Sequence, residues 1–165
     1  SKLLLEKCQN HLSTGTKILQ LRSKDFIEQS YIEIIHRLCQ SYEARLILNV
    51  PNKTFKEPCD GWHLTSDELL NYKKRPCTNN KLLGASAHNM KEAKYAEAIS
   101  VDYISLAPIE ETPSHPNAVP LGWVVAKDIV SKSNLPVYLL GGMGKDSLDR
   151  ALNINAQGVA GISRI

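Results

Sequence analysis

The sequence predicts an α/β fold, and within that class a (β/α)8 or TIM barrel that lacks its first strand in this chain. Short apolar runs alternate with longer amphipathic stretches along the 165 residues, which is typical of parallel strands joined by crossover helices. Polar and glycine residues gather at the carboxyl ends of the predicted strands, where such barrels form their sites. The pattern holds about seven strands and opens on a helix, so we expect the missing strand upstream of Ser1. A doubly wound open sheet is the alternative, but its glycines normally follow the first strand, and here they come at the end.

The first half of the chain alternates helices and strands. The predicted elements are a helix over Lys2–Leu12, a strand over Lys17–Arg22, a helix capped by Asp25 that runs past Leu38, a strand over Arg45–Val50, and a strand that ends at Gly61–Leu64. Pro51 ends the second of these strands because proline has no backbone N–H to donate.

The second half repeats the same rhythm. The predicted elements are a short helix capped by Ser66 or Asp67, strands over Leu82–His88, Asp102–Leu106, Pro136–Leu140 and Gln157–Ile162, and helices over Met90–Ala98, Gly122–Ser131 and Asp146–Ile154. A proline-rich loop, Ala107–Pro120, interrupts this rhythm, and a long loop in a compact domain indicates a binding loop or lid.

Composition excludes several classes of protein. The length predicts one domain over 1–165, and 42% hydrophobic residues exclude disorder as the main state. A net charge of +3 is too small for a protein that wraps nucleic acid. No uncharged apolar run reaches the roughly 18 residues of a membrane span, so we expect a cytoplasmic protein. The four cysteines form no CxxC pair and are expected to be reduced, small apolar side chains.

Cationic and amide side chains end the first predicted strand. Gln20, Arg22 and Lys24 are spaced by two, which projects them to one side of the strand. A guanidinium fork beside an ammonium suits a phosphate or diphosphate. The alternative is a strand end that is polar only because it is solvated.

Glycines follow the last two predicted strands. Gly141-Gly142 and Gly161-Ile162-Ser163 would let two neighbouring backbones aim N–H groups at an anion. A double glycine by itself is more often a plain turn, but its pairing with a second glycine-rich strand end favours a phosphate site.

Hydroxyl and imidazole groups offer two further candidates. Ser86 and His88 share one face of a predicted strand, but no GxSxG motif accompanies them, so Ser86 is interpreted as a hydrogen-bonding group and not as a nucleophile. In the proline-rich loop, Thr112, Ser114 and His115 could bind an anion or form a polar surface. Trp62 and His63 are interpreted as packing residues.

The order of these motifs resembles the thiamin phosphate synthase and thiazole tautomerase (TenI) superfamily. The resemblance runs from about Thr16 to the last residue. It rests on Gln20-Leu21-Arg22-Ser23-Lys24, Leu48-Asn49, Gly61-Trp62-His63-Leu64, Gly84-Ala85-Ser86-Ala87-His88, Asp102 to Pro108, Gly141-Gly142 and Gly158 to Ser163. It implies a (β/α)8 barrel that binds thiazole phosphate. The synthase joins this substrate to a pyrimidine diphosphate and releases diphosphate with the help of Mg²⁺.

Carried over by position, the resemblance implies a role for each candidate. The catalytic positions are Arg22, Lys24, Ser86 and His115, the last standing where the synthase has a lysine. The substrate-binding positions are Gln20, Asn49, Thr112, Ser114, Gly141, Gly142, Ile162 and Ser163.

Two further departures weaken a direct transfer of activity. Val50 stands where the synthase has a magnesium-holding aspartate, so Glu68, or Asp67 beside it, is the remaining candidate for the metal. One carboxylate is thin support for Mg²⁺. Pro108 stands where the tautomerase has its catalytic histidine.

The predicted function is therefore a thiamin phosphate synthase-like transferase with a degraded magnesium site. The alternatives are a thiazole tautomerase-like isomerase with His115 or His88 as base, or a phosphate-binding domain without activity. The loop and Leu121-Gly122-Trp123 also resemble a branch of the family that is fused to a Nudix hydrolase domain. The expected partners are phosphorylated small molecules, that Nudix domain and a second copy of the chain, with neither nucleic acid nor a membrane.

Overall fold

The computed structural model describes residues 2–112 and 117–161. The chain divides into two compact units. Unit 1 comprises Ser1–His63 and Pro76–Leu82, and unit 2 comprises Leu64–Arg75 and Leu83–Ile165. The predicted count of about seven strands is confirmed for the described residues, which contain β1 to β7.

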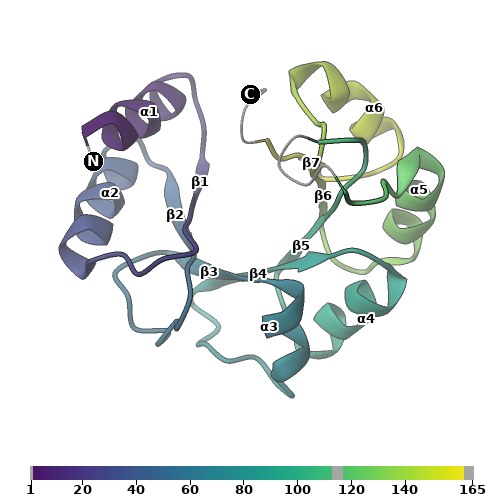
Figure 1. Ribbon diagram of the computed structural model, residues 1–165, viewed down its shortest axis with the longest axis horizontal. Helices are drawn as coiled ribbons and strands as arrows, with labels where there is room; N and C mark the ends of the chain where they lie inside the picture. Colours follow the sequence, from purple (N-terminus) through teal and green to yellow (C-terminus); the bar gives the residue numbers. More distant parts are fainter. Residues whose placement is uncertain (1, 113–116, 162–165) are drawn as a thin grey trace. The chain divides into compact units, whose positions relative to one another are not determined.

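Unit 1 is built on parallel strands in the order β1-β2-β3. Its elements are α1 (Lys2–Ser13), β1 (Ile18–Arg22), α2 (Gln29–Ser41), β2 (Arg45–Asn49) and β3 (Gly61–Leu64). Helices α1 and α2 lie side by side next to β1 and β2 (Figure 1). Leu46, Ile47 and Leu48 are fully buried, so β2 is covered on both faces, as a strand inside a parallel sheet must be.

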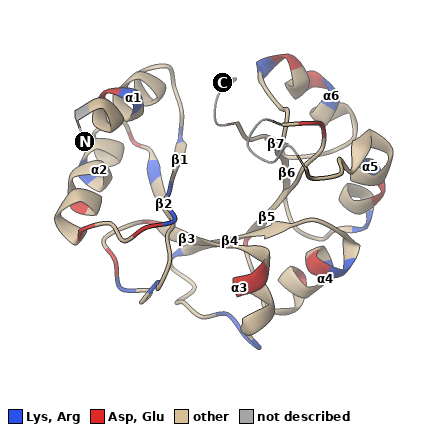
Figure 2. Ribbon diagram, in the orientation of Figure 1, with Lys and Arg blue, Asp and Glu red and all other residues tan. Residues whose placement is uncertain are grey.

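Unit 2 continues the alternation with parallel strands in the order β4-β5-β6-β7. Its elements are α3 (Ser66–Asn71), β4 (Leu82–Ala87), α4 (Met90–Ala98), β5 (Tyr103–Leu106), α5 (Gly122–Lys132), β6 (Val137–Leu139), the 3₁₀ turn η1 (Lys145–Ser147), α6 (Leu148–Asn153) and β7 (Gly158–Val159). Strands β3 to β7 carry no charged residue, whereas α4, α5 and α6 carry both signs and α3 carries acidic residues (Figure 2). This division places the apolar strands inside and the charged residues on the helices, as expected for an α/β fold.

The starts of three helices differ from the prediction. Helix α2 begins at Gln29 after Glu28, not after Asp25, and Phe26 lies outside the helix with 84% of its surface exposed. Helix α3 is capped by Thr65, whose hydroxyl accepts the Glu68 N–H. Asp146 lies in η1, and α6 begins only at Leu148. Several capping residues stand close together in each segment, and the spacing of apolar residues does not choose among them.

The cysteines confirm their interpretation as apolar side chains. Cys8, Cys39 and Cys59 are buried, and Cys77 is half-buried. Burial raises the pKa of the Cys39 thiol to about 11 and that of Cys59 to about 12. Within the described part of the chain, no helix combines the length and the apolar character that crossing a bilayer requires.

Candidate functional site

Three polar residues end the neighbouring strands of unit 1. Arg22 of β1 is in register with Asn49 of β2, and the Ser23 N–H donates to the Asn49 carbonyl at 3.1 Å. Leu48 is in register with Trp62, so the next residue of β3, His63, follows beside Asn49. Arg22 is exposed, whereas Asn49 and His63 are 6% and 1% exposed. These three residues thus form a row that has the exposed Arg22 guanidinium at one end, followed by the buried amide of Asn49 and the buried imidazole of His63.

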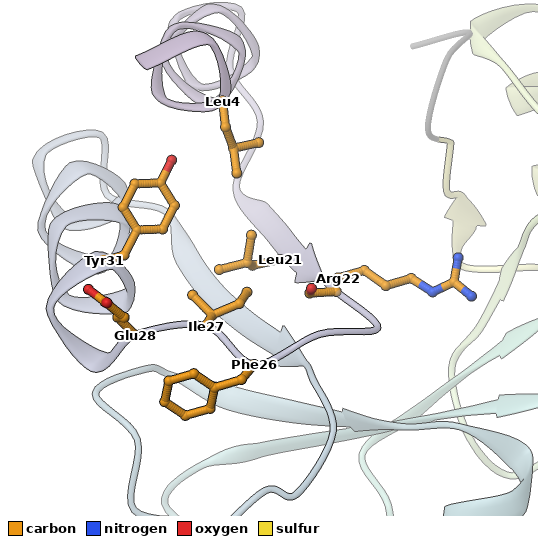
Figure 3. Close-up of a pocket in the computed structure, with 8 residues that line it drawn as sticks. Leu4, Leu21, Arg22, Phe26, Ile27, Glu28 and Tyr31 are labelled. Atoms are coloured by element: carbon orange, nitrogen blue, oxygen red, sulfur yellow. The ribbon is translucent and has the colours of Figure 1, made fainter. Parts of the chain in front are cut away.

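The predicted alternation along β1 is confirmed for Gln20 and Arg22. Both are exposed, while Leu21 between them is 5% exposed. Figure 3 shows the Arg22 side chain extending away from Leu21 and Ile27. Lys24 is also exposed, but it lies in the loop after β1 and not in the strand. Of the three residues predicted to share one face, Gln20 and Arg22 thus lie on one face of β1, and Lys24 lies outside the strand.

Buried His63 is held in its neutral form. Burial, followed by the charges of Lys53 and Arg22, lowers the pKa of His63 from 6.5 to about 3. The imidazole therefore carries one N–H donor and one acceptor nitrogen at neutral pH. The same shift indicates that the Lys53 ammonium and the Arg22 guanidinium both lie within electrostatic reach of the ring.

A carboxylate fixes the loop that follows β2. Glu57 accepts hydrogen bonds from the Thr54 N–H at 2.8 Å, the Thr54 hydroxyl at 2.9 Å and the Lys56 N–H at 3.2 Å. Its Oε2 also accepts the indole N–H of Trp62 at 2.9 Å, so the loop is tied to β3. The Phe55 ring packs edge-on against Trp62, with 5.3 Å between ring centroids.

The pKa of Glu57 agrees with these hydrogen bonds. Burial by itself raises the pKa of the carboxyl, but the hydrogen bonds from Thr54, Glu57's own backbone and Trp62 outweigh it and lower the pKa below 4.5. The carboxylate is therefore ionised at neutral pH and accepts charge-assisted hydrogen bonds, the stronger kind. Trp62 is 2% exposed, which confirms its interpretation as a packing residue.

A groove of about 380 Å³ lies elsewhere in unit 1 (Figure 3). Its lining is mostly apolar and comes from α1, β1, α2 and the segment that joins β1 to α2: Leu4, Leu21, Arg22, Ser23, Phe26, Ile27, Glu28 and Tyr31. The Arg22 side chain leads away from this lining, so the groove is not the place where the strand-end polar groups meet.

In unit 2, two serines stand at the same level of neighbouring strands. Ser86 of β4 is in register with Ser105 of β5, and Ser105 is 7% exposed while Ser86 is half-buried. His88 lies past the end of β4, where its backbone N–H and its Nδ1 both contact the Glu92 carboxylate, at 2.8 and 3.0 Å. Glu92 lies in the first turn of α4, so His88 belongs to the capping of that helix.

The predicted double glycine follows β6 in a backbone conformation that favours glycine. Gly141 has φ +92° and Gly142 has φ +73°. A Cβ on Gly141 would come within 2.8 Å of the Pro108 Cα, and one on Gly142 within 2.8 Å of the Glu110 Cβ. Both positions therefore require glycine, because the loop after β5 lies directly against them.

A glutamate and a tryptophan hold that loop in place. The Glu110 N–H donates to the Gly141 carbonyl at 3.1 Å, and the Glu110 Oε1 accepts the Trp123 indole N–H at 2.7 Å. The Arg150 guanidinium lies 4.2 Å from the centroid of the Trp123 ring. This chain of contacts joins β6, the loop after β5, α5 and α6.

Four predicted site residues lie outside the described residues: Ser114, His115, Ile162 and Ser163. Thr112 is described and half-buried. Their predicted roles stay predictions, as do those of the candidates described above.

The predicted magnesium site finds little support in the donor set. Val50, at the position of the missing aspartate, is 7% exposed and offers only backbone groups. In unit 2 the Glu68 carboxylate accepts the Thr65 N–H at 2.8 Å as the second half of a capping box, and Asp67 is exposed. Among the described residues, no group of three or more His, Cys, Asp and Glu side chains could hold a metal ion. These residues do not fit a site for Mg²⁺, which prefers near-octahedral oxygen ligands.

Sequence reasoning missed two features that the structure brings together. Glu57 lies in a loop without periodicity, so no pattern indicated that it contacts Trp62 of β3. Glu110 and Trp123 are 13 residues apart, and only the fold joins them.

Comparison with known proteins decides the family. The family model for thiamine monophosphate synthase matches residues 1–165. This chain belongs to the thiamine monophosphate synthase family. A putative thiamine-phosphate synthase 2 of Aquifex aeolicus is 34% identical over 163 residues, which cover 96% of this chain and 88% of that protein. A thiamine-phosphate synthase of Fusobacterium nucleatum is 32% identical, over 96% of this chain and 80% of that protein.

A solved structure confirms the fold class. The thiamine phosphate pyrophosphorylase of Pyrococcus furiosus matches with a TM-score of 0.75 at 22% identity, over 95% of this chain and 77% of that one. The chain therefore has the TIM-barrel-like α/β fold of the thiamine monophosphate synthase family, and its relatives support a role in thiamine biosynthesis. The Nudix fusion, the homodimer and the strand upstream of Ser1 stay predictions.

Proposed function

We propose that this chain is a thiamin phosphate synthase-like transferase, which joins thiazole phosphate to a pyrimidine diphosphate. The observation that carries the proposal is the strand-end row of unit 1, in which exposed Arg22 is in register with buried Asn49 and lies within electrostatic reach of neutral His63. Among the described residues, no carboxylate forms an ion pair with the Arg22 guanidinium, so its charge is available to an anion.

The reaction is a substitution at the methylene carbon of the pyrimidine. The bond between this carbon and the diphosphate oxygen breaks, and its electron pair leaves with the diphosphate. The thiazole nitrogen then supplies the electron pair of the new carbon–nitrogen bond. Catalysis is mainly stabilisation of the leaving group and positioning of the two substrates, so cations and hydrogen-bond donors matter more than a nucleophile.

Each residue has a role in this scheme that fits its chemistry. The Arg22 guanidinium binds two diphosphate oxygens at once, Lys24 adds a point charge, and the amides of Gln20 and Asn49 orient the leaving group. In unit 2, Ser86 donates a hydrogen bond to the pyrimidine substrate. The backbone at Gly141 and Gly142, where both residues have a positive φ, binds the phosphate of the thiazole.

The decisive experiment supplies the full-length protein with both substrates, with and without Mg²⁺, and measures thiamin phosphate and released diphosphate. We expect turnover. We also expect Arg22→Ala to lower kcat/KM at least about 100-fold, because the negative charge that develops on the diphosphate in the transition state loses the guanidinium that stabilises it. Arg37→Ala removes an exposed arginine of α2 that pairs with Glu33, and serves as the matched control. Absence of product under all conditions, from protein that is folded, would refute the proposal.

A thiazole tautomerase-like isomerase is the second candidate. The observation that favours it is the 3.0 Å contact between His88 Nδ1 and the Glu92 carboxylate, because this contact orients the ring and leaves Nε2 as the nitrogen that can take up a proton. A His88→Gln variant with an unchanged isomerisation rate would exclude His88 as the base. A thermal shift by thiazole phosphate without turnover of either reaction would instead support a binding role.

A further inference from the structure

We propose that Trp123 is a positioning residue for the phosphate of the thiazole: its indole holds Glu110, and Glu110 holds the backbone at Gly141. The inference deepens the proposed function and rests on it. It starts from a side chain that the predicted roles left unused.

Glu110 contacts two elements of unit 2 at once. Its backbone N–H donates to the Gly141 carbonyl at 3.1 Å, in the segment that follows β6. Its Oε1 accepts the indole N–H of Trp123 at 2.7 Å, in the first turn of α5. The residue therefore links α5 to the first glycine of the proposed phosphate site.

The contact at the Gly141 carbonyl sets the direction of a whole peptide group. The peptide bond between Gly141 and Gly142 is trans, so its C=O and N–H point in opposite directions. Glycine adopts positive and negative φ about equally well, so two successive glycines do not hold one conformation by themselves. Contacts from outside must hold them, and the Glu110 N–H supplies one at the carbonyl. A backbone that is fixed before an anion arrives binds it more tightly, because less conformational freedom is lost on binding.

Trp123 completes the link between α5 and Glu110. The backbone N–H groups of residues 121 and 122 donate to the carbonyls of Pro108 and Ile109, at 2.8 and 3.0 Å. These two bonds hold the loop after β5 as far as residue 109. The indole of Trp123 extends the link by one residue, to the one that contacts the glycine backbone.

The indole of Trp123 is itself held on its face. The Arg150 guanidinium of α6 lies 4.2 Å from the ring centroid, a cation–π contact. Because the indole N–H is bonded to Glu110, the indole acts on the phosphate through Glu110 and not by direct contact. We therefore expect its loss to raise KM for thiazole phosphate, and to leave kcat and KM for the pyrimidine diphosphate within about twofold.

The test is calorimetric titration of the full-length protein with thiazole phosphate. Trp123→Phe keeps an aromatic ring but removes the N–H donor, and we expect it to weaken binding at least about fivefold. Glu110→Leu removes the acceptor and is expected to do the same. Glu110→Gln keeps an acceptor oxygen and is expected to retain most of the affinity. A second readout is the NMR signal of the indole N–H: the chain has two tryptophans, and thiazole phosphate should shift the signal of Trp123 more than that of Trp62.

Glu97 of α4 offers a matched control in the same unit. Its carboxylate accepts the Asn134 N–H at 2.8 Å, and Asn134 lies shortly before β6 begins, at the end of the strand opposite to Gly141. Glu97→Leu thus removes a similar contact between a glutamate and a loop, but at the amino end of β6. We expect it to lower the unfolding midpoint as Glu110→Leu does, while its affinity for thiazole phosphate stays within about twofold of the unaltered protein.

The outcomes separate the two proposals. Equal affinity of Trp123→Phe and the unaltered protein overturns the inference even when the protein makes thiamin phosphate, and so does an equal loss in Glu110→Leu and Glu97→Leu. A signal of Trp62 that shifts more than that of Trp123 also counts against it. Thiazole phosphate binding that depends on Trp123 and Glu110, in a protein that makes no thiamin phosphate, supports the inference and refutes the synthase activity. No binding of thiazole phosphate to the unaltered protein overturns the inference.

Discussion

Both units hold a strand-end loop with the same pair of side chains, a glutamate that accepts a tryptophan indole N–H. In unit 1 the pair is Glu57 and Trp62, at 2.9 Å, and in unit 2 it is Glu110 and Trp123, at 2.7 Å. The surroundings differ. Glu57 also binds three donors of its own loop, whereas Glu110 lies against the backbone of Gly142 and its tryptophan lies under Arg150.

The same Glu–Trp hydrogen bond thus fixes loops in two different surroundings, each of which is a predicted binding surface. In unit 1 it fixes a loop next to charged and titratable side chains, so we expect that surface to respond to charge and pH. In unit 2 it fixes a loop against two glycines, so we expect that surface to respond to side-chain volume.

At neutral pH, the largest expected effect comes from filling the space in unit 2. Gly141→Ala adds a Cβ within 2.8 Å of the Pro108 backbone at φ +92°. We expect a loss of about 3 kcal/mol in the free energy of unfolding, because strain and overlap add. Gly122→Ala is the control, since φ is +71° there but nothing lies within 4 Å of the added atom, and we expect a loss of about 1 kcal/mol. Equal losses in urea denaturation would contradict the role assigned to the close loop.

The next effect is the pH dependence of unit 1. The folded-state pKa of His63 is about 3, below its ordinary 6.5, so between these values the unfolded chain binds the extra proton. Stability is therefore lost as the pH falls from about 6.5 toward 3, with a slope from this group of at most about 1.4 kcal/mol per pH unit. We expect His63→Asn to flatten the acid side of the stability curve.

His11→Asn, which changes an exposed histidine of α1, is the matched control for that experiment. Stability is measured by denaturant unfolding at a series of pH values. A His63→Asn curve that runs parallel to that of the unaltered protein would show that His63 is not the group that titrates.

The smallest expected effect concerns the hydrogen bonds that the Glu57 carboxylate accepts. Glu57→Gln keeps the shape of the side chain but removes the charge, and we expect a loss of about 1 kcal/mol at neutral pH. The pKa of Glu57 is below 4.5 in the folded state, so its contribution is complete above that pH and is lost as the pH falls through the folded value. The variant and the unaltered protein should therefore converge in acid. A constant gap between their unfolding midpoints at all pH values would show that the charge is not what matters.

The sequence allowed the order and kind of the described elements to be predicted, because apolar periodicity reports which residues a parallel sheet and its helices bury. It also placed Arg22, Asn49 and the double glycine at strand ends, since each directly follows or ends an apolar run. The start of α2 was not predicted, because Asp25 is of a preferred capping type, whereas the helix begins after Glu28, whose side chain makes no capping hydrogen bond.

The loop contacts could not be predicted for a different reason. Glu57 lies in a segment with no period, and only the fold brings it to the indole of Trp62. Glu110 and Trp123 are separated by a loop whose middle lies outside the described residues. Hydrogen bonds of this kind depend on three-dimensional proximity, on which residue spacing carries no information.

The buried cysteines have a practical consequence for handling the protein. Only the thiolate form of a cysteine reacts readily with alkylating or oxidising agents. With a pKa of about 12, Cys59 is a thiolate in about one molecule in 100,000 at pH 7, and it is also closed to reagents by burial. Cys39 is fully buried too. Of the four cysteines, half-buried Cys77 is therefore where a maleimide dye is expected to attach first, leaving the folded protein intact.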